Sequence, residues 1–222
     1  MAERAVDAVI FDMDGVLLDS ERAWDEVREE LTAEHGGRWH DAAQRDMMGM
    51  NSQEWPAYMR TRLGVNLDDA RILRMVTDAL AARYRVRLPL LPGADTAVRA
   101  LAGRWPLAVA SSSPAELIEA ALAAAGLRDA FAHVVSSEAV PRGKPAPDVY
   151  LLAARRLGAP AGRCVAVEDS GNGILAGLAA GMAVVAIPNP DYPPPGDVLR
   201  RCAAVLTGIA ALTTEVVAAA AG

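Results

Sequence analysis

Short apolar runs rich in β-forming residues alternate with helical segments along most of this chain, and this alternation restricts the possible folds more than any other feature. The runs lie at residues 6–12, 106–110, 133–136, 164–168 and 182–188, with a weaker one at 204–207. Apolar runs of this length between turn residues are typical of buried strands. Because helices separate them, the sequence predicts a parallel sheet with right-handed crossovers, an α/β Rossmann-like core.

The helices between these runs carry boundary signals of their own. Ser113 and Glu116 have the spacing of a capping box, which predicts that the Ser113 hydroxyl caps a helix ending at Gly126. This assignment leaves Ser113 without any further role. Another helix is predicted to open at Pro147 and to end at Gly158.

Residues 18–89 interrupt the alternation. They indicate four helices and no convincing strand, and Ser20 is expected to cap the first helix. The simplest arrangement is a small α-helical cap domain at 18–89, inserted after the first strand. Residues 1–17 and 90–222 then form the α/β core domain.

Composition and charge exclude several functional classes. Hydrophobic residues make up 52% and charged residues 23%, as in a globular protein, and the net charge of −6 argues against a nucleic-acid partner. No apolar run approaches the ~18 residues of a membrane helix, so no membrane partner is expected. The first residues do not resemble a signal peptide, and Cys164 and Cys202 are too few for a disulfide framework. We therefore expect a cytoplasmic protein.

Polar residues follow four of the predicted strands at the point where each strand ends. They are Asp12 and Asp14, then Ser111 and Ser112, then Lys144, and finally Glu168 and Asp169. Because the carboxyl ends of parallel strands share one edge of the sheet, we expect these groups to converge. Carboxylates together with a lysine and hydroxyls suit a hard divalent cation bound beside a phosphate.

Taken singly, most of these groups have an ordinary structural explanation. Asp14 fits a turn, Ser111 fits a capping loop, and the acids at 168–169 fit the start of a helix. Lys144 is harder to explain in this way, because it is the only lysine among 22 basic residues. Prolines on its loop restrict the backbone there, so the ammonium is expected to be held in place.

The four motifs, in this order and spacing, resemble those of the haloacid dehalogenase superfamily. They read Asp12-Met13-Asp14-Gly15-Val16, Ser111, Lys144 and Glu168-Asp169, and the resemblance covers essentially the whole chain. It is strongest to the β-phosphoglucomutase-like branch, in which a helical cap follows the first motif.

The resemblance implies an enzyme that transfers phosphoryl groups. Asp12 would be the nucleophile that forms an aspartyl-phosphate, and Asp14 would be first the general acid and then the general base. Ser111, Ser112 and Lys144 would bind the oxygens of the transferring phosphoryl group.

The resemblance also implies a metal cofactor. Mg²⁺ would be held by the Asp12 carboxylate, the Asp14 backbone carbonyl and Asp169, with Glu168 as a further ligand or a neighbour of the ligands. The expected partner is a small phosphorylated metabolite, and a cap of this size implies a monomer.

Departures from the branch favour a phosphatase over a mutase. The mutases carry a histidine in the linker to the cap, where this chain has Trp24, and cations in a cap loop that is apolar here. If this chain were a mutase, Arg38 or Arg45 would have to replace those cations. A non-catalytic phosphate-binding module is the other alternative, which the intact Asp12 and Asp14 pair makes less attractive.

Four apolar residues of the cap are candidates for contact with the substrate. They are Trp24, Met48, Met50 and Trp55. Met and Trp at helical spacing also fit the core of the cap, so the sequence leaves both positions open for each of them.

Overall fold

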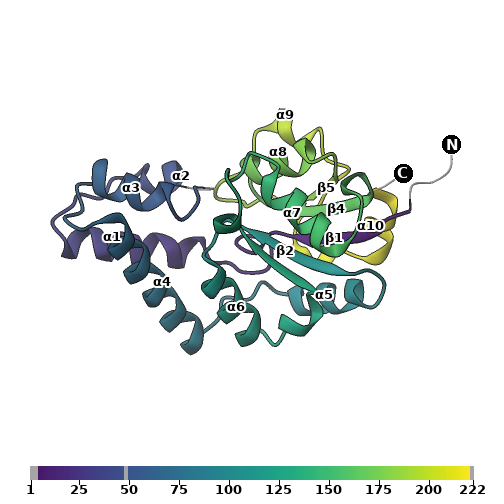
Figure 1. Cartoon of the computed structure of the whole chain (residues 1–222), viewed down its shortest axis with the longest axis horizontal. Helices are drawn as coiled ribbons and strands as arrows, with labels where there is room; N and C mark the ends of the chain where they lie inside the picture. The colour runs from purple at the N-terminus through teal and green to yellow at the C-terminus, as the bar shows by residue number, and fades with distance from the viewer. Residues whose placement is uncertain (1–4, 48–49, 221–222) are drawn as a thin grey trace.

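A six-stranded parallel sheet forms the centre of the molecule, as a computed structural model describing residues 5–47 and 50–220 shows (Figure 1). Its strands are β1 (Ala8–Phe11), β2 (Leu107–Ser111), β3 (His133–Ser136), β4 (Cys164–Glu168), β5 (Ala183–Ala186) and β6 (Ala204–Val205). The strand order is β3-β2-β1-β4-β5-β6, which confirms the predicted α/β fold. The chain moves outward from β1 to β3 and then returns to β4 on the other side of β1. Ligands of such sheets bind at this reversal, beyond the carboxyl ends of the strands.

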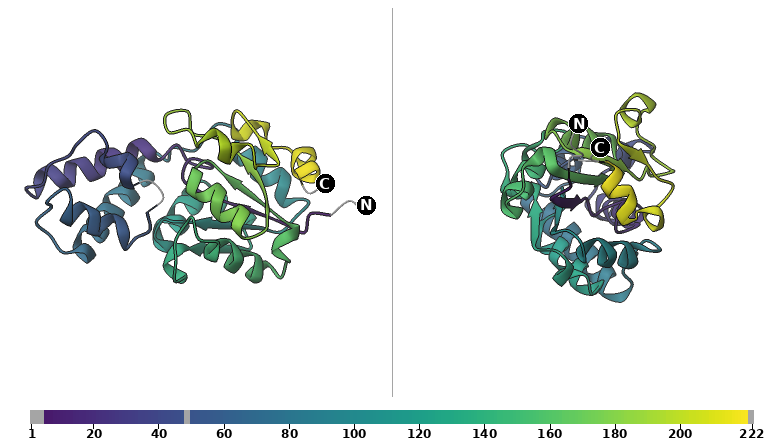
Figure 2. Two further views of the ribbon diagram at one scale, coloured as in Figure 1. Left: turned by 90° about the horizontal axis from the view of Figure 1, so that it is seen from above. Right: turned by 90° about the vertical axis from the view of Figure 1, so that its right-hand side faces the viewer.

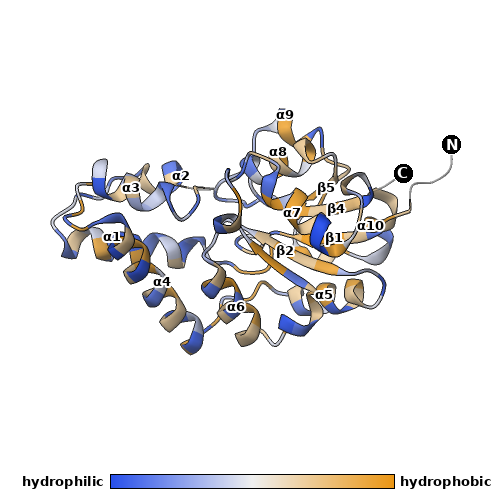
Figure 3. Cartoon of the chain, in the orientation of Figure 1, coloured by the Kyte–Doolittle hydropathy of each residue, from blue (hydrophilic) through white to orange (hydrophobic). Residues whose placement is uncertain are grey.

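Helices cover both faces of the sheet because strand side chains point alternately to opposite faces. The helices of this part are α5 (Ala94–Ala102), α6 (Ala115–Ala124), α7 (Asp148–Leu157), α8 (Gly171–Ala179), α9 (Gly196–Leu199) and α10 (Thr214–Ala220). On β1, Val9 and Phe11 pack with apolar side chains of α5, α6 and α10. Ala8 and Ile10 pack on the other face with α7, α8 and α9. Figure 3 shows largely apolar strands between helices in which apolar and polar residues are mixed.

Four helices between β1 and α5 form a separate lobe, seen at the left of Figure 1 and of the left view in Figure 2. They are α1 (Glu21–Glu34), α2 (Ala43–Met47), α3 (Glu54–Thr61) and α4 (Asp69–Val86). Their packing follows helical spacing, for example through Ile72, Val76 and Leu80, which are buried on one face of α4. The two chain segments that connect this lobe to the sheet domain lie side by side. Asp19 N–H on the first segment donates to Pro89 O on the second at 2.8 Å.

None of the helices in the described part of the chain is long and apolar enough to cross a lipid bilayer.

Candidate active site

The first strand delivers two aspartates to the carboxyl edge of the sheet. Asp12 directly follows β1, and its N–H donates to Val167 O on β4 at 2.9 Å, so the backbone is fixed by the sheet. Gly15 then turns the chain with φ of 77°, a left-handed conformation that favours glycine. A Cβ at Gly15 would lie 2.0 Å from Asp169 Oδ2, so the missing side chain makes room for that carboxylate.

Three carboxylates gather in the space beside this turn. Oxygen atoms of Asp12, Glu168 and Asp169 all lie within 4.8 Å of one another, and all three residues are buried. Burial raises the pKa of Asp12 to about 8, and burial together with Glu168 and Asp12 raises the pKa of Asp169. Oxygen ligands and an excess of buried negative charge fit a hard divalent cation such as Mg²⁺.

The close fit between Gly15 and Asp169 gives a prediction about this candidate cation site. Gly15→Ala should weaken Mg²⁺ binding by about 10- to 100-fold, because the new methyl group displaces a carboxylate that would hold the ion. Calorimetric titration with Mg²⁺ measures the change. Gly64→Ala is the matched control, because Gly64 has the same φ of 77° and nothing within 4 Å of its Cβ position. Equal Mg²⁺ affinity in both variants would contradict the prediction.

Lys144 lies between two of these acids. Its Nζ is 2.9 Å from Asp12 Oδ1 and 2.6 Å from Glu168 Oε1, and its side chain is 3% exposed. Burial alone would lower the pKa of Lys144, but Asp12 and Glu168 raise it above its usual value, so the ammonium stays charged. Glu168 Oε1 also accepts from Tyr150 Oη at 2.8 Å, and its Oε2 accepts from Asp169 N–H at 3.1 Å. Glu168 is therefore well placed to hold Lys144 beside Asp12, which leaves Asp12 and Asp169 freer to bind an ion.

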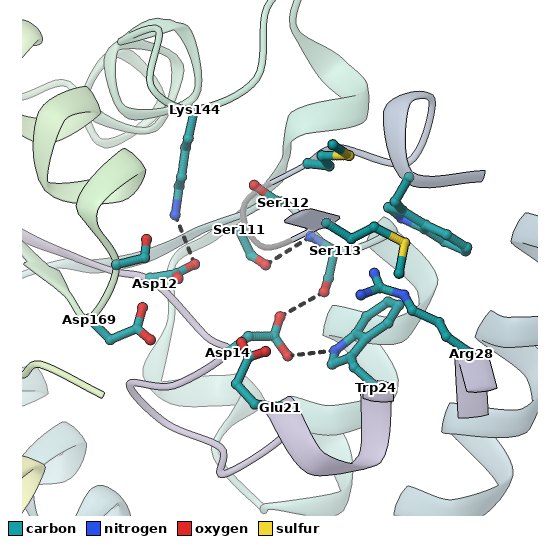
Figure 4. A pocket seen from close by; sticks show the side chains of 14 residues that line it. Asp12, Asp14, Glu21, Trp24, Arg28, Ser111, Ser112, Ser113, Lys144 and Asp169 are labelled. Atoms are coloured by element: carbon teal, nitrogen blue, oxygen red, sulfur yellow. Dashed lines mark hydrogen bonds and ion pairs between the residues drawn. The ribbon is translucent and has the colours of Figure 1, made fainter. Parts of the chain in front are cut away.

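Asp14 is held by hydroxyl and indole donors from both lobes. Its Oδ1 accepts from Ser20 Oγ at 2.5 Å. As Figure 4 shows, its Oδ1 also accepts from Trp24 Nε1 at 3.1 Å, and its Oδ2 accepts from Ser113 Oγ at 2.7 Å. The predictions that Ser20 and Ser113 cap helices are therefore wrong. Neither hydroxyl caps the helix that follows it, because both point to a carboxylate, and bonds to a charged acceptor are stronger.

The loop after β2 brings hydroxyl groups to the same place. Ser111 Oγ accepts from Ser113 N–H at 3.0 Å, which tightens the loop. Ser112 Oγ is buried and has no hydrogen-bond partner among the residues that the structure describes. Both serines line a cavity with Asp12, Asp14 and Lys144. A buried hydroxyl without a partner indicates a place where a ligand oxygen is expected.

The cavity itself is small. It encloses about 70 Å³, much less than the ~300–1,000 Å³ of a pocket that encloses a whole small molecule. In this conformation it has room for a group such as a phosphoryl rather than for a complete metabolite.

The cap forms the opposite wall of the cavity. Trp24, Met50 and Trp55 lie on this wall, and the two tryptophans are also buried in the cap, whereas Met48 lies outside the described residues. The sequence left open whether these residues face the substrate or pack in the core of the cap. The two tryptophans do both, because each lines the cavity and is buried in the cap. Arg38 and Arg45, the cations that a mutase would need, are exposed and do not line the cavity.

Glu21 and Arg28 also line this wall, and the sequence analysis missed both. Burial raises the pKa of Glu21 to about 7 and lowers the pKa of Arg28 to about 10. Their positions carry a signal that could have been used, because residues 21, 24 and 28 lie on one face of a helix. Trp24 had already been singled out on that face.

Comparison with known proteins identifies the family of this chain. Residues 6–181 match the family profile of the haloacid dehalogenase-like hydrolases. The chain is 36% identical over 204 residues to hexitol phosphatase B of Escherichia coli, covering 85% of this chain and 86% of that protein. It is 36% identical over 184 residues to the fructose-1-phosphate phosphatase YqaB of the same organism, covering 80% and 94%. The fold resembles a β-phosphoglucomutase from Clostridium difficile with a TM-score of 0.82 and 18% identity, covering 97% of each chain.

Proposed function

This chain belongs to the haloacid dehalogenase-like hydrolases, and its relatives indicate a phosphatase. We propose that it is a member of the β-phosphoglucomutase-like branch that hydrolyses a small hydroxylated phosphate monoester with Mg²⁺ through a covalent intermediate on Asp12. The observation that carries this proposal is the meeting of Asp12, Lys144 and Asp169 at one end of the sheet. The carboxylate oxygens of the two aspartates are within 4.8 Å of each other, and Lys144 Nζ is 2.9 Å from Asp12 Oδ1.

In the first step an Asp12 carboxylate oxygen attacks phosphorus and the bond from phosphorus to the ester oxygen breaks. Asp14 gives a proton to the departing alcohol. Lys144 and the Ser111 and Ser112 hydroxyls bind the phosphoryl oxygens, where charge is concentrated during transfer.

In the second step Asp14 takes a proton from water, whose oxygen attacks phosphorus and releases phosphate from Asp12. The hydroxyls of Ser20 and Ser113 and the indole of Trp24 hold the Asp14 carboxylate for both tasks. Mg²⁺ bound by Asp12, the Asp14 carbonyl and Asp169 would neutralise charge on the transferring group.

Residues 18–89 act in this proposal as a cap over the catalytic groups of the core. Trp24 supports this division, because it belongs to α1 and yet donates to Asp14, which follows β1. The small cavity implies that the two lobes separate to admit a substrate and close again before the chemistry. Closure would exclude bulk water from the transfer step.

The substrate is proposed to be a sugar or sugar-alcohol monophosphate, a class supported by the names of the two relatives. A bisphosphate-binding mutase is the less favoured alternative. Such an enzyme holds a second phosphate on the cap, and Arg38 and Arg45 are exposed and do not line the cavity. Arg45 lines a neighbouring open pocket, which Ser170 joins to the cavity.

Assays of phosphate release from a panel of phosphorylated sugars and sugar alcohols test this function. Mg²⁺ should be required, so that EDTA reduces release to background and added Mg²⁺ restores it. A mutase would instead interconvert phosphosugar isomers without net phosphate release, and a binding module would retain ligand without turnover. Either result, or full activity in excess EDTA, would contradict the proposal.

A further inference from the structure

Arg28 is a buried cation on the cap wall that the proposed chemistry does not use. It is 5% exposed and lines the cavity, and its guanidinium carbon lies 4.4 Å from the Trp24 ring and 4.8 Å from the Trp55 ring (Figure 4). Contacts of this kind fix the plane of the guanidinium group. Arg28 is therefore held rigidly at the edge of the place where the phosphoryl group is expected.

The hydrogen bonds of this guanidinium are incomplete. Nη1 donates to Gln44 Oε1 at 3.2 Å, whereas Nε is buried and meets no acceptor within residues 5–47 and 50–220. No carboxylate of the described residues forms an ion pair with Arg28 at 4.0 Å or less. An unpaired buried donor on a charged group is costly unless a ligand supplies the acceptor.

Glu21 lies on the same wall and adds a carboxyl group to it. Gln44 Nε2 donates to Glu21 Oε2 at 2.7 Å, so the amide of Gln44 joins Glu21 to Arg28. The wall thus offers a cationic donor on Arg28 and a carboxyl acceptor on Glu21. A second anionic group on the substrate would meet Glu21 and Asp14 as well as Arg28, whereas neutral hydroxyl groups can bind to both Arg28 and Glu21.

We propose that Arg28 is a specificity-determining residue that donates hydrogen bonds to hydroxyl oxygens of the leaving alcohol, and that it selects neutral polyol or sugar monophosphates over substrates with a second anionic group. This inference rests on the proposed phosphatase function and concerns only the choice of substrate. Arg28 takes no part in transferring the phosphoryl group.

The variant Arg28→Met tests the proposal, because methionine keeps an unbranched apolar stem between the tryptophans and removes the donors. We expect kcat/KM for a hexitol monophosphate to fall by about 10- to 100-fold, the usual effect of losing a hydrogen bond from a charged group. With p-nitrophenyl phosphate, whose leaving group has no hydroxyl to accept these bonds, the change should stay below about threefold. Arg22→Met is the matched control, because Arg22 is an exposed residue of the same helix.

Monodeoxy analogues of the hexitol phosphate show whether the N–H donors of Arg28 bind a hydroxyl group of the substrate. For the wild-type enzyme, at least one analogue should have a lower kcat/KM than the parent compound. For Arg28→Met, the same analogue and the parent compound should have equal kcat/KM values. A structural role would not produce this difference. Arg28→Lys, which keeps the charge and loses the planar fork, should retain part of the selectivity.

Three results would overturn the proposal. One is an equal loss on the hexitol phosphate and on p-nitrophenyl phosphate, and another is no loss on either. The third is a wild-type preference for a sugar bisphosphate or a phosphorylated carboxylic acid over the neutral monophosphates. Failure of the proposed function looks different, because the wild-type protein would then release phosphate from none of these compounds.

Discussion

Asp12→Asn is expected to reduce phosphate release by at least about 10⁴-fold while leaving the fold intact. An amide oxygen is a poor nucleophile toward phosphorus and carries no charge to attract a cation, so both the attack and the metal site are impaired. The substitution is nearly isosteric, and the Asp12 N–H still donates to Val167 O in the sheet. Lys144 keeps Glu168 as an ion-pair partner.

Phosphate release measured beside circular dichroism and thermal unfolding separates loss of chemistry from loss of fold. Asp19→Asn is the matched control, because Asp19 is exposed and lies on the same segment. The control should keep full activity. A folded Asp12→Asn protein with turnover close to the wild-type rate would remove Asp12 from the nucleophile role.

Asp14→Asn is expected to slow both steps, and the size of the first effect should depend on the leaving group. An alkyl alcohol needs a proton as it departs, so formation of the intermediate should fall by about 10²- to 10⁴-fold. Nitrophenolate departs without a proton, so its release in the first turnover should change little. Breakdown of the intermediate should be slow with either substrate, because water is then attacked without a base.

Rapid-mixing kinetics with p-nitrophenyl phosphate measure the two steps of Asp14→Asn separately. We expect a burst of about one nitrophenol per enzyme followed by a slow phase, and no burst with an alkyl phosphate. Asparagine keeps an acceptor for Ser20 and Trp24, so the cap and core should still pack as in the wild type. An equal slowing of the first turnover for both leaving groups would count against an acid role for Asp14.

The strand ends could be predicted from the sequence because parallel topology determines where they lie. Once residues 8–11 and 164–168 are strands of one parallel sheet, Asp12 and Asp169 must emerge at the same edge. Lys144 follows the same reasoning, with its uniqueness in the composition as a second signal. The positions of Asp12 and Asp169 depend on topology alone, which the alternation of strands and helices determines, whereas Lys144 lies on the loop that follows β3.

Contacts between side chains that are far apart in the sequence could not be predicted in this way. The spacing of Ser113 and Glu116 fits a capping box, but only tertiary packing brings Asp14 within 2.7 Å of the Ser113 hydroxyl. The position of Arg28 in the cavity likewise depends on how α1 packs against the core. Charged residues are mostly exposed, so nothing in the sequence marks Arg28 as buried, whereas Trp24 and Trp55 bury it in the structure.

Chemical trapping of the intermediate tests the covalent mechanism most directly. Borohydride reduces an acyl-phosphate, so quenching the Asp14→Asn variant during turnover of p-nitrophenyl phosphate with Mg²⁺ should convert Asp12 to homoserine. Peptide mass spectrometry should find this change at position 12 and at no other acid, and only when substrate and Mg²⁺ are both present. Release of a full burst of nitrophenol with Asp12 unmodified, or with the modification on another residue, would contradict the mechanism.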